Sequence, residues 1–210
     1  MSEKKVSAAV IRRLPRYFRY LGELLNQGID RISSNELSER MGVTASQIRQ
    51  DLNCFGGFGQ QGFGYQVDFL YNEIGNILGV YNGYTVIIIG AGNLGRALAN
   101  YRFFNREGYK IIGIFDNAQE VVGETIKDLT VLHVDALEQF MGQQQADIAI
   151  LAIPRDTVPD IAEKLVKYGI KGLWNYSFAE LSFDEPVAVE NVHLSDSLMT
   201  LSYKVAQLEK

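Results

Sequence analysis

The sequence of 210 residues predicts an α/β protein, in which a helical N-terminal domain precedes a doubly wound parallel sheet. Short amphipathic helices dominate up to about residue 80, and buried strands then alternate with helices up to residue 194. A last amphipathic segment follows the completed sheet. We therefore divide the chain into residues 1–83, 84–194 and 195–210.

Three helices are predicted in the first domain before its glycine-rich segment. Apolar residues fall on one face over Ser7–Leu25, where Pro15 is expected to interrupt or restart the helix. The second helix begins at a capping box, Ser33–Glu36, and ends at Gly42. The third begins at another capping box, Thr44–Gln47. The last two helices therefore meet across a tight turn.

This pair of short helices matches a helix-turn-helix, whose second helix presents its outer face to the major groove of DNA. If Ile48, Leu52 and Phe55 are buried, the outer face carries polar side chains that can bind bases or phosphates. An exposed polar face without a ligand explains the pattern equally well when the helix is taken alone. The residues left on or near the exposed face are Ala45, Ser46, Gln47, Arg49, Gln50 and Asn53. The candidate DNA contacts on this helix and its cap are Thr44, Ser46, Gln47, Arg49 and Gln50.

A glycine-rich segment, residues 56–65, follows the third helix and cannot be helical. Its five glycines alternate with aromatic and amide residues, which favours a β-hairpin. A hairpin directly after a recognition helix is the wing of a winged-helix domain, and its tip can enter a minor groove or lie along phosphates. We predict DNA contacts from Phe58 and Gly59, followed by a connecting helix near residues 67–78.

Charge is divided unevenly along the chain. The net charge is −5, with +3 in residues 1–65 and −8 in the remainder. Four arginines fall within eight positions of the first predicted helix, and three of them are candidate phosphate contacts. A solvated helix face would show the same pattern. The candidates are Arg12, Arg13 and Arg16.

The second domain opens with the signature of a dinucleotide-binding fold. Thr85–Ile89 is continuously apolar, as in a parallel strand buried on both faces, and a glycine-rich turn leads from it into a helix. The next strand, Lys110–Phe115, ends at Asp116, which is placed to accept both ribose hydroxyls of NAD and would repel the 2′-phosphate of NADP. We predict a Rossmann site for NAD(H). Its turn consists of Gly90, Ala91, Gly92, Asn93, Leu94 and Gly95.

Further strands are predicted at residues 129–134, 147–153, 170–174 and 187–194, with helices at 136–141 and 157–168. Ligands of such sheets lie beyond the carboxyl ends of the strands, so Ile153, Pro154 and Asn175 are candidates to line the cofactor cleft. Ordinary loop packing also explains Ile153 and Pro154. Because the reduced nicotinamide ring is uncharged, an apolar pocket there would favour NADH over NAD+.

Little in the sequence suggests catalysis. A dehydrogenase needs a substrate domain and a general acid or base, but His133 and His193 lie in no recognisable catalytic arrangement. We predict no catalytic residue, and we interpret the nucleotide as a signal for a DNA-binding repressor. The alternatives are a small NAD-dependent dehydrogenase and an adaptor that binds protein in place of DNA.

Composition limits the location and the partners. No apolar run reaches the roughly 18 residues that span a bilayer, and no signal segment follows the N-terminus, so a cytoplasmic protein is expected. Cys54 is the only cysteine, which excludes a disulfide framework and a thiolate metal site. Neither a membrane nor a metal is expected as a partner.

The last segment, residues 195–210, carries an apolar stripe after the sheet is complete. Such a helix often packs on a partner subunit, and helix-turn-helix proteins usually bind DNA as dimers, so we predict a homodimer. The alternative is a helix folded back on its own sheet. The stripe consists of Leu198, Leu201, Val205 and Leu208.

Taken together, these segments resemble the Rex family of bacterial redox-sensing transcriptional repressors. The resemblance rests on Arg13–Leu21, Gln47–Leu52, the wing from Phe55 to Val67, and the glycine turn with Asp116. It implies a homodimer with swapped C-terminal helices that leaves its operator DNA when NADH displaces NAD+. It also implies that Tyr101 serves the cofactor site, and that cofactor state is coupled to domain orientation through Arg19, Tyr101 and Asp196.

The chain departs from the family pattern at a few positions. Gln50 stands where a lysine is common, and Gly57, Gln60 and Gln61 stand where the wing often carries charge, so weaker phosphate affinity is expected. Residues 176–178 lack a proline that often follows the Asn-aromatic pair. Tyr101 shares a stripe with apolar neighbours, so burial in the core is the alternative to its family role.

Overall fold

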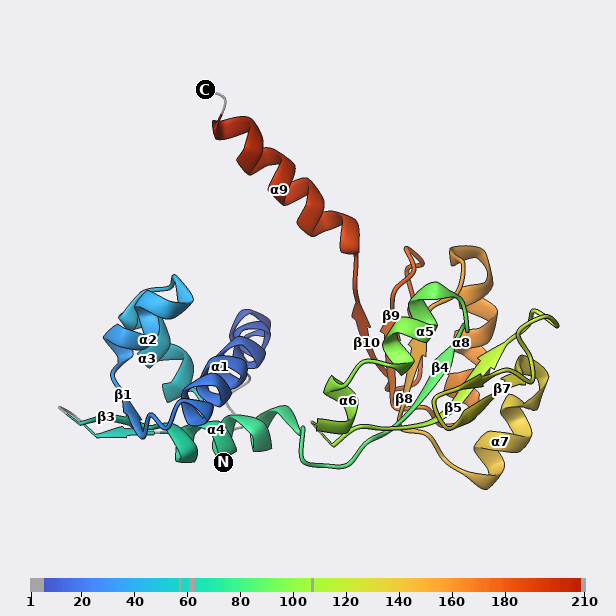
Figure 1. Ribbon diagram of the computed structural model, residues 1–210, viewed down its shortest axis with the longest axis horizontal. Coiled ribbons are helices and arrows are strands. Elements are labelled where there is room, and N and C mark those ends of the chain that lie inside the picture. The colour runs from blue at the N-terminus through green and yellow to red at the C-terminus, as the bar shows by residue number, and fades with distance from the viewer. Residues whose placement is uncertain (1–5, 57, 61–62, 107, 209–210) are drawn as a thin grey trace. The chain divides into compact units, whose positions relative to one another are not determined.

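The computed structural model describes residues 6–56, 58–60, 63–106 and 108–208. The chain divides into two compact units, residues 1–81 and residues 82–210, and each is considered by itself. In Figure 1 the blue-to-cyan unit is mostly helical, whereas the green-to-red unit is built around a sheet.

The first unit combines helices with a small antiparallel sheet of order β1-β3-β2. Helices α1 and α4 pack together, and the Phe18 and Tyr71 rings stack between them with centroids 4.2 Å apart. The helices are α1 (Ala8–Asn26), α2 (Ser34–Met41), α3 (Ala45–Asn53) and α4 (Val67–Leu78), and the strands are β1 (Arg31–Ile32), β2 (Gly59–Gln60) and β3 (Gly64–Gln66).

Helix α1 runs without interruption through Pro15, so the expected break is wrong. A proline inside a helix costs roughly 3 kcal/mol, since it removes a hydrogen bond and crowds the preceding turn. Leu14, Leu21 and Phe18 are buried on the same helix, and each such side chain contributes roughly 1.5–3 kcal/mol on burial. Tertiary packing therefore outweighs the local preference of proline.

The helix-turn-helix follows the sequence signals closely. Ser33 and Glu36 form the reciprocal capping box of α2, and Gly42 ends that helix in the left-handed conformation with φ of 63°. Thr44 caps α3 by accepting from the backbone N–H of Gln47. The second box is only half formed, because the Gln47 side chain binds elsewhere.

The wing is present as the antiparallel hairpin β2–β3, with Gly59 opposite Tyr65 and Gln60 opposite Gly64. Strand β1, which precedes α2, pairs with the other side of β3. Residues 57, 61 and 62 lie outside the described residues, so the departures noted at Gly57 and Gln61 and the expected contacts of the wing tip have no structural account.

The second unit holds a seven-stranded sheet of order β10-β9-β8-β4-β5-β7-β6. All neighbours pair in parallel except β6, a short antiparallel edge strand that the sequence analysis did not predict. The order reverses at β4, and this switch point is where an open α/β sheet binds its ligand. The strands are β4 (Thr85–Ile89), β5 (Lys110–Asp116), β6 (Thr125–Ile126), β7 (Leu129–His133), β8 (Ile148–Leu151), β9 (Gly172–Asn175) and β10 (Ala188–Asn191).

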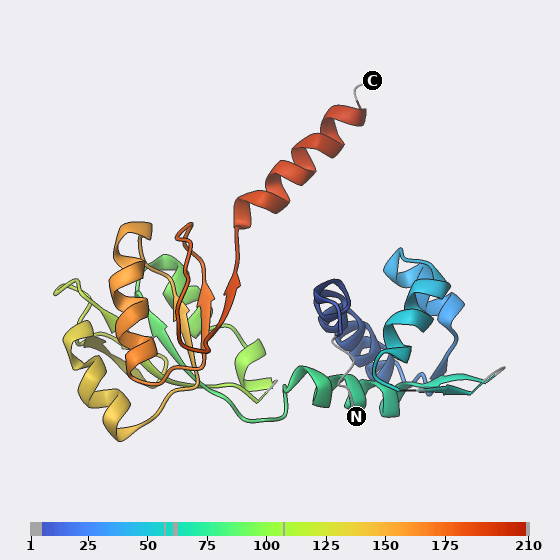
Figure 2. The same ribbon diagram turned by 180° about the vertical axis from the view of Figure 1, so that it is seen from behind.

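Helices cover both faces of this sheet (Figure 2). One buried cluster joins α7 and α8 to the sheet around Phe115 and Leu165, and another joins α5 and α6 around Ile88 and Phe104. This two-sided packing explains why β4 is apolar at every position but its first. The helices are α5 (Asn93–Ala99), α6 (Phe103–Arg106), α7 (Leu137–Gln143) and α8 (Val158–Lys167).

The last helix, α9 (Leu194–Leu208), has no buried residue over its length. Its apolar side chains are open to solvent, with Leu198 64% exposed and Leu208 87% exposed. Within the described residues, none of the helices has the length and apolar character needed to cross a bilayer.

Candidate functional site

The glycine turn joins β4 to α5 at the switch point of the sheet. Gly90 has φ of 104°, and a β-carbon there would clash with the carbonyl oxygen of Ala152 on the neighbouring strand end. A β-carbon on Gly95 would clash with the carbonyl oxygen of Gly90, so this glycine lets the helix pack against the turn. Gly92, in contrast, faces open space, with no atom within 4 Å of such a carbon. The turn is closed on its inner side and open where a ligand would approach.

The turn is also braced by Arg96, whose role the sequence analysis missed. Its Nε donates to the carbonyl oxygen of Ala91 at 2.8 Å, and its guanidinium forms an ion pair with Glu124. The signal was an arginine one position after the glycine motif, which by itself has no specific meaning. This brace fixes the turn before any ligand is bound.

Asp116 lies directly against the turn, at the end of β5. Its Oδ2 accepts from the backbone N–H of Ala91 at 2.6 Å, and its Oδ1 accepts from that of Ala118 at 2.9 Å. A carboxylate has about four acceptor positions, so two remain for further donors. The acid is therefore held by the backbone and keeps the capacity to accept two hydroxyl groups.

The three loop candidates beyond the strand ends differ in what they can contact. Ile153 is half-buried and lies next to Gly90, and Pro154 is exposed at the start of the following turn of helix. Asn175 is fully buried, and its amide is used up within the protein. Its Nδ2 donates to Ala179 O and Asn191 Oδ1, and its Oδ1 accepts from Ser177 twice. The predicted cofactor contact from the Asn175 side chain therefore needs correction, because that side chain shapes the loop instead.

Tyr101 is 54% exposed, so its burial in the core is ruled out. Its ring stacks on Phe103 with centroids 5.8 Å apart. Burial raises the pKa of Tyr176, and the electrostatic effect of Tyr101 raises it further. Tyr101 is thus open to solvent just beyond the C-terminal end of α5.

The two histidines occupy separate positions. His133 ends β7 and lies 3.1 Å from Asp135. The His193 ring stacks face to face on Phe178 at 5.0 Å, and its buried Nδ1 has no hydrogen-bond partner within the described part of the chain. Among the residues that the structure describes, neither ring is hydrogen-bonded to a serine, threonine or cysteine side chain.

The recognition helix α3 buries Ile48 and Leu52, whereas Phe55 lies beyond its end and is half-buried. Arg49 is exposed and donates to the Ser34 hydroxyl at 2.8 Å, which links α3 to α2. Thr44 and Cys54 are also exposed. The polar residues exposed along the helix are Ser46, Arg49, Gln50 and Asn53.

A buried carboxylate lies behind this face. Asp51 is completely buried, and Arg13 donates to it twice, from Nε at 2.6 Å and from Nη2 at 2.8 Å. The Tyr17 hydroxyl and the Gln47 amide complete its four hydrogen bonds. Burial raises the pKa of Asp51, but the hydrogen bonds from Arg13, Gln47 and Tyr17 outweigh it and lower the pKa overall. Neither the burial of Asp51 nor its pairing with Arg13 was predicted.

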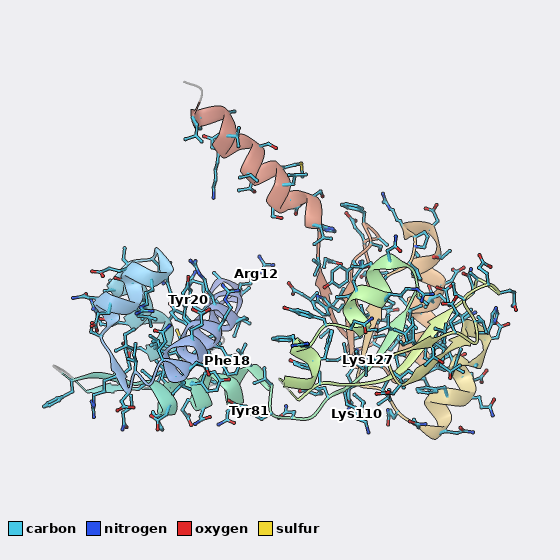
Figure 3. The ribbon with its side chains drawn as sticks, viewed as in Figure 1. Arg12, Phe18, Tyr20, Tyr81, Lys110 and Lys127 are labelled. Carbon is cyan, nitrogen blue, oxygen red and sulfur yellow. The ribbon has the colours of Figure 1, made fainter. Side chains whose placement is uncertain are left out.

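The other first-domain candidates remain on or near the surface. Arg12 and Arg16 are exposed on α1, where Figure 3 labels Arg12, and the Arg16 guanidinium lies 5.9 Å from the Tyr20 ring. Arg19, also exposed, lies 5.8 Å from the same ring. Phe58 is half-buried and packs edge-on against Phe69, so its ring is partly taken up by the core.

Comparisons with known proteins agree with both units. Residues 5–53 match the family model described as "Putative DNA-binding protein N-terminus", and residues 82–179 match the "CoA binding domain" model. The redox-sensing transcriptional repressor Rex of Caldanaerobacter subterraneus subsp. tengcongensis is 57% identical over 210 residues, which cover 100% of this chain and 94% of the relative. The chain belongs to the Rex family.

Solved structures of the Rex-family repressor RSP share the fold. RSP bound to NAD+ and operator DNA superposes with a TM-score of 0.90 at 55% identity, covering 97% of this chain and 94% of that one. RSP bound to NADH gives 0.90 at 52% identity, covering 98% and 97%. The Rex resemblance drawn from the sequence is therefore confirmed, as is the two-part fold with its C-terminal helix.

A separate cavity of about 280 Å³ lies at the amino ends of β5 and β7, lined by Lys110 and Lys127, which Figure 3 labels. It lies at the opposite ends of the strands from the glycine turn. It therefore forms no part of the cofactor site.

Asp196, the remaining candidate, is exposed in the first turn of α9.

Proposed function

We propose that this member of the Rex family is a cytoplasmic redox-sensing transcriptional repressor, which binds operator DNA as a homodimer and leaves it when NADH replaces NAD+. The observation that carries this proposal is the pairing of an open dinucleotide turn in one unit with an exposed polar recognition helix in the other. RSP, with the same fold, has been solved with NAD+ and operator DNA and with NADH. The protein is a regulator, and the nucleotide is its effector.

The cofactor lies along the turn at Gly90–Gly95, where the pyrophosphate approaches Gly92 and the first N–H groups of α5, Asn93 and Leu94. Asp116 accepts the two ribose hydroxyls with its remaining acceptor positions. Its charge repels the 2′-phosphate of NADP. This arrangement favours NAD(H).

Discrimination between the two redox states falls to the apolar surface beside the turn. Ile153, Pro154 and Tyr101 line the place of the nicotinamide. Removing the positive ring of NAD+ from water costs more than removing the neutral ring of NADH. The pocket therefore favours NADH, and the shift between dimer states is limited by this difference in affinity.

The DNA surface combines phosphate contacts from α1 with base contacts from α3. Arg12 and Arg16 serve the phosphates, together with Phe58 and Gly59 of the wing region. We assign no phosphate contact to Arg13, because two of its nitrogens already donate to Asp51. The contacts from α3 and its cap are Thr44, Ser46, Gln47, Arg49 and Gln50.

The dimer is held by the C-terminal helix, residues 195–210, which swaps onto the partner subunit. The exposed apolar stripe of α9 supports this, because such a surface is stable in water only when something covers it. Three exposed residues with charged or polar side chains couple the redox state of the bound nucleotide to the orientation of the domain at residues 1–83. They are Arg19, Tyr101 and Asp196.

Fluorescence anisotropy tests this function. Labelled duplex selected from a random pool is titrated with protein, and NADH or NAD+ is then added separately. We expect NADH to release the duplex and NAD+ to leave it bound. Equal effects of the two nucleotides, or no selectable duplex, would contradict the proposal.

A further inference from the structure

The four hydrogen bonds to Asp51 fill its acceptor positions. Oδ2 accepts from Arg13 Nε and from the Tyr17 hydroxyl, and Oδ1 accepts from Arg13 Nη2 and from Gln47 Nε2. A carboxylate offers about four such positions. The group is fully buried and fully satisfied.

The charge on Asp51 decides which way the Gln47 amide points. An ionised carboxylate only accepts hydrogen bonds, so Gln47 must offer its NH2 group, at 2.8 Å. The rotated amide would put its carbonyl oxygen against a carboxylate oxygen, which is repulsive. The Gln47 orientation is thus fixed by chemistry as well as by geometry.

Gln47 lies in the first turn of α3, four residues before Asp51, on the helix that carries the exposed polar face. With one N–H committed to Asp51, its side chain keeps a carbonyl oxygen and one N–H for another partner. In the major groove, adenine and cytosine present an amino group that such an oxygen can accept from, whereas guanine and thymine present acceptors at the corresponding positions.

We propose that Asp51 is a specificity-determining positioning residue, which holds the Gln47 amide with its carbonyl oxygen outward so that Gln47 selects a base carrying an amino group. Arg13 and Tyr17 of α1 complete the support from behind the recognition helix. This inference rests on the proposed function, since it assumes that α3 reads DNA.

The test uses the full-length protein with NAD+ and a duplex selected by that protein from a random pool. Every single-base substitution of the selected duplex is measured for binding. We expect adenine or cytosine at the base that Gln47 reads, and Gln47→Ala should reduce preference at that base pair by on the order of 5- to 150-fold. Asp51→Asn should weaken the preference at the same base pair or turn it toward guanine or thymine.

Two controls separate positioning from general loosening. Tyr17→Phe removes a donor from Oδ2 but leaves the Gln47 contact on Oδ1, so stability should fall while base preference stays. Gln50 is exposed on the same helix, and the base pairs that respond to Gln50→Ala should keep their preference in Asp51→Asn.

If Asp51→Asn does not fold, the combined variant Arg13→Met, Tyr17→Phe, Asp51→Leu replaces the network with apolar side chains, which buried ion pairs often tolerate. It should fold and lose the preference that depends on Gln47. The proposal is overturned if the Asp51 variant weakens all duplexes by one common factor, if Gln47→Ala changes no preference, or if Tyr17→Phe shifts the same base pair. Failure of the parent protein to select any duplex would instead count against the proposed function.

Discussion

Replacing Arg13 with methionine should destabilise the first unit by about 3–5 kcal/mol, because it removes the charge partner of a buried carboxylate. Asp51 has no exposed surface, and the Arg13 side chain is only 28% exposed. Water therefore does little to stabilise the carboxylate once Arg13 is removed. The variant keeps two of the four hydrogen bonds, from Tyr17 and Gln47. A loss of this size is a large part of the roughly 5–15 kcal/mol that stabilises a typical domain.

Urea unfolding of the full-length protein provides the assay, with hydrogen exchange of peptides from α1 and α3 as the local readout. Trp174, the only tryptophan, lies in β9 and reports the second unit, so its fluorescence transition should hardly move. Arg12→Met, at an exposed neighbouring position, is the matched control and should change stability by less than about 0.5 kcal/mol. Equal effects of the two substitutions would refute the reasoning.

The pH dependence follows from the lowered pKa of Asp51. A carboxyl group whose pKa is lower in the folded state adds stability above its unfolded pKa of about 3.9, and loses it as pH falls through the folded value. The parent protein should therefore lose this contribution in acid. Arg13→Met removes the main hydrogen-bond donor to Asp51. The difference in free energy of unfolding between parent and variant should therefore shrink below about pH 4. A difference that stays constant down to pH 2 would contradict the role of the ion pair.

Three further predictions concern the second unit. Asp147 accepts hydrogen bonds from Thr85 and from Lys171, the latter at 2.7 Å. Burial raises the pKa of Asp147, but these bonds lower it overall. Asp147→Asn should therefore reduce the free energy of unfolding by about 1–3 kcal/mol at neutral pH and by much less below pH 4, as measured by Trp174 fluorescence. Asp116→Ala should weaken NADH binding on the order of 10- to 100-fold by calorimetry, and unchanged affinity would exclude a ribose contact. Deleting residues 195–210 should convert dimer to monomer by light scattering, and a dimer that persists would exclude α9 as its main contact.

Much of the fold could be predicted because its signals are local. The capping box at Ser33, the left-handed Gly42 and the continuous apolar strand at Thr85–Ile89 each reflect one element and its immediate neighbours. The helical path through Pro15 could not be predicted in this way. It depends on how α1 packs against α4, which a local sequence pattern does not reveal.

The site residues also differ in whether a local sequence pattern could predict them. The glycine turn and Asp116 were found because spacing along the chain determines their contact. Arg13 and Asp51 are 38 residues apart, and nothing in either local pattern indicates that they meet. Asn175 was misread because its position at a strand end suggests a ligand contact, whereas its hydrogen bonds all lie within its own loop and strand neighbour.

The central claim is that operator occupancy follows the redox state of the nucleotide. The most direct measurement holds the total NAD(H) concentration constant, varies the ratio of NADH to NAD+, and records the fraction of labelled operator duplex bound to the full-length protein. We expect the bound fraction to fall as NADH replaces NAD+, and to stay unchanged when NADPH replaces NADP+ in the same way. A bound fraction that depends on total nucleotide and not on the ratio would contradict the account.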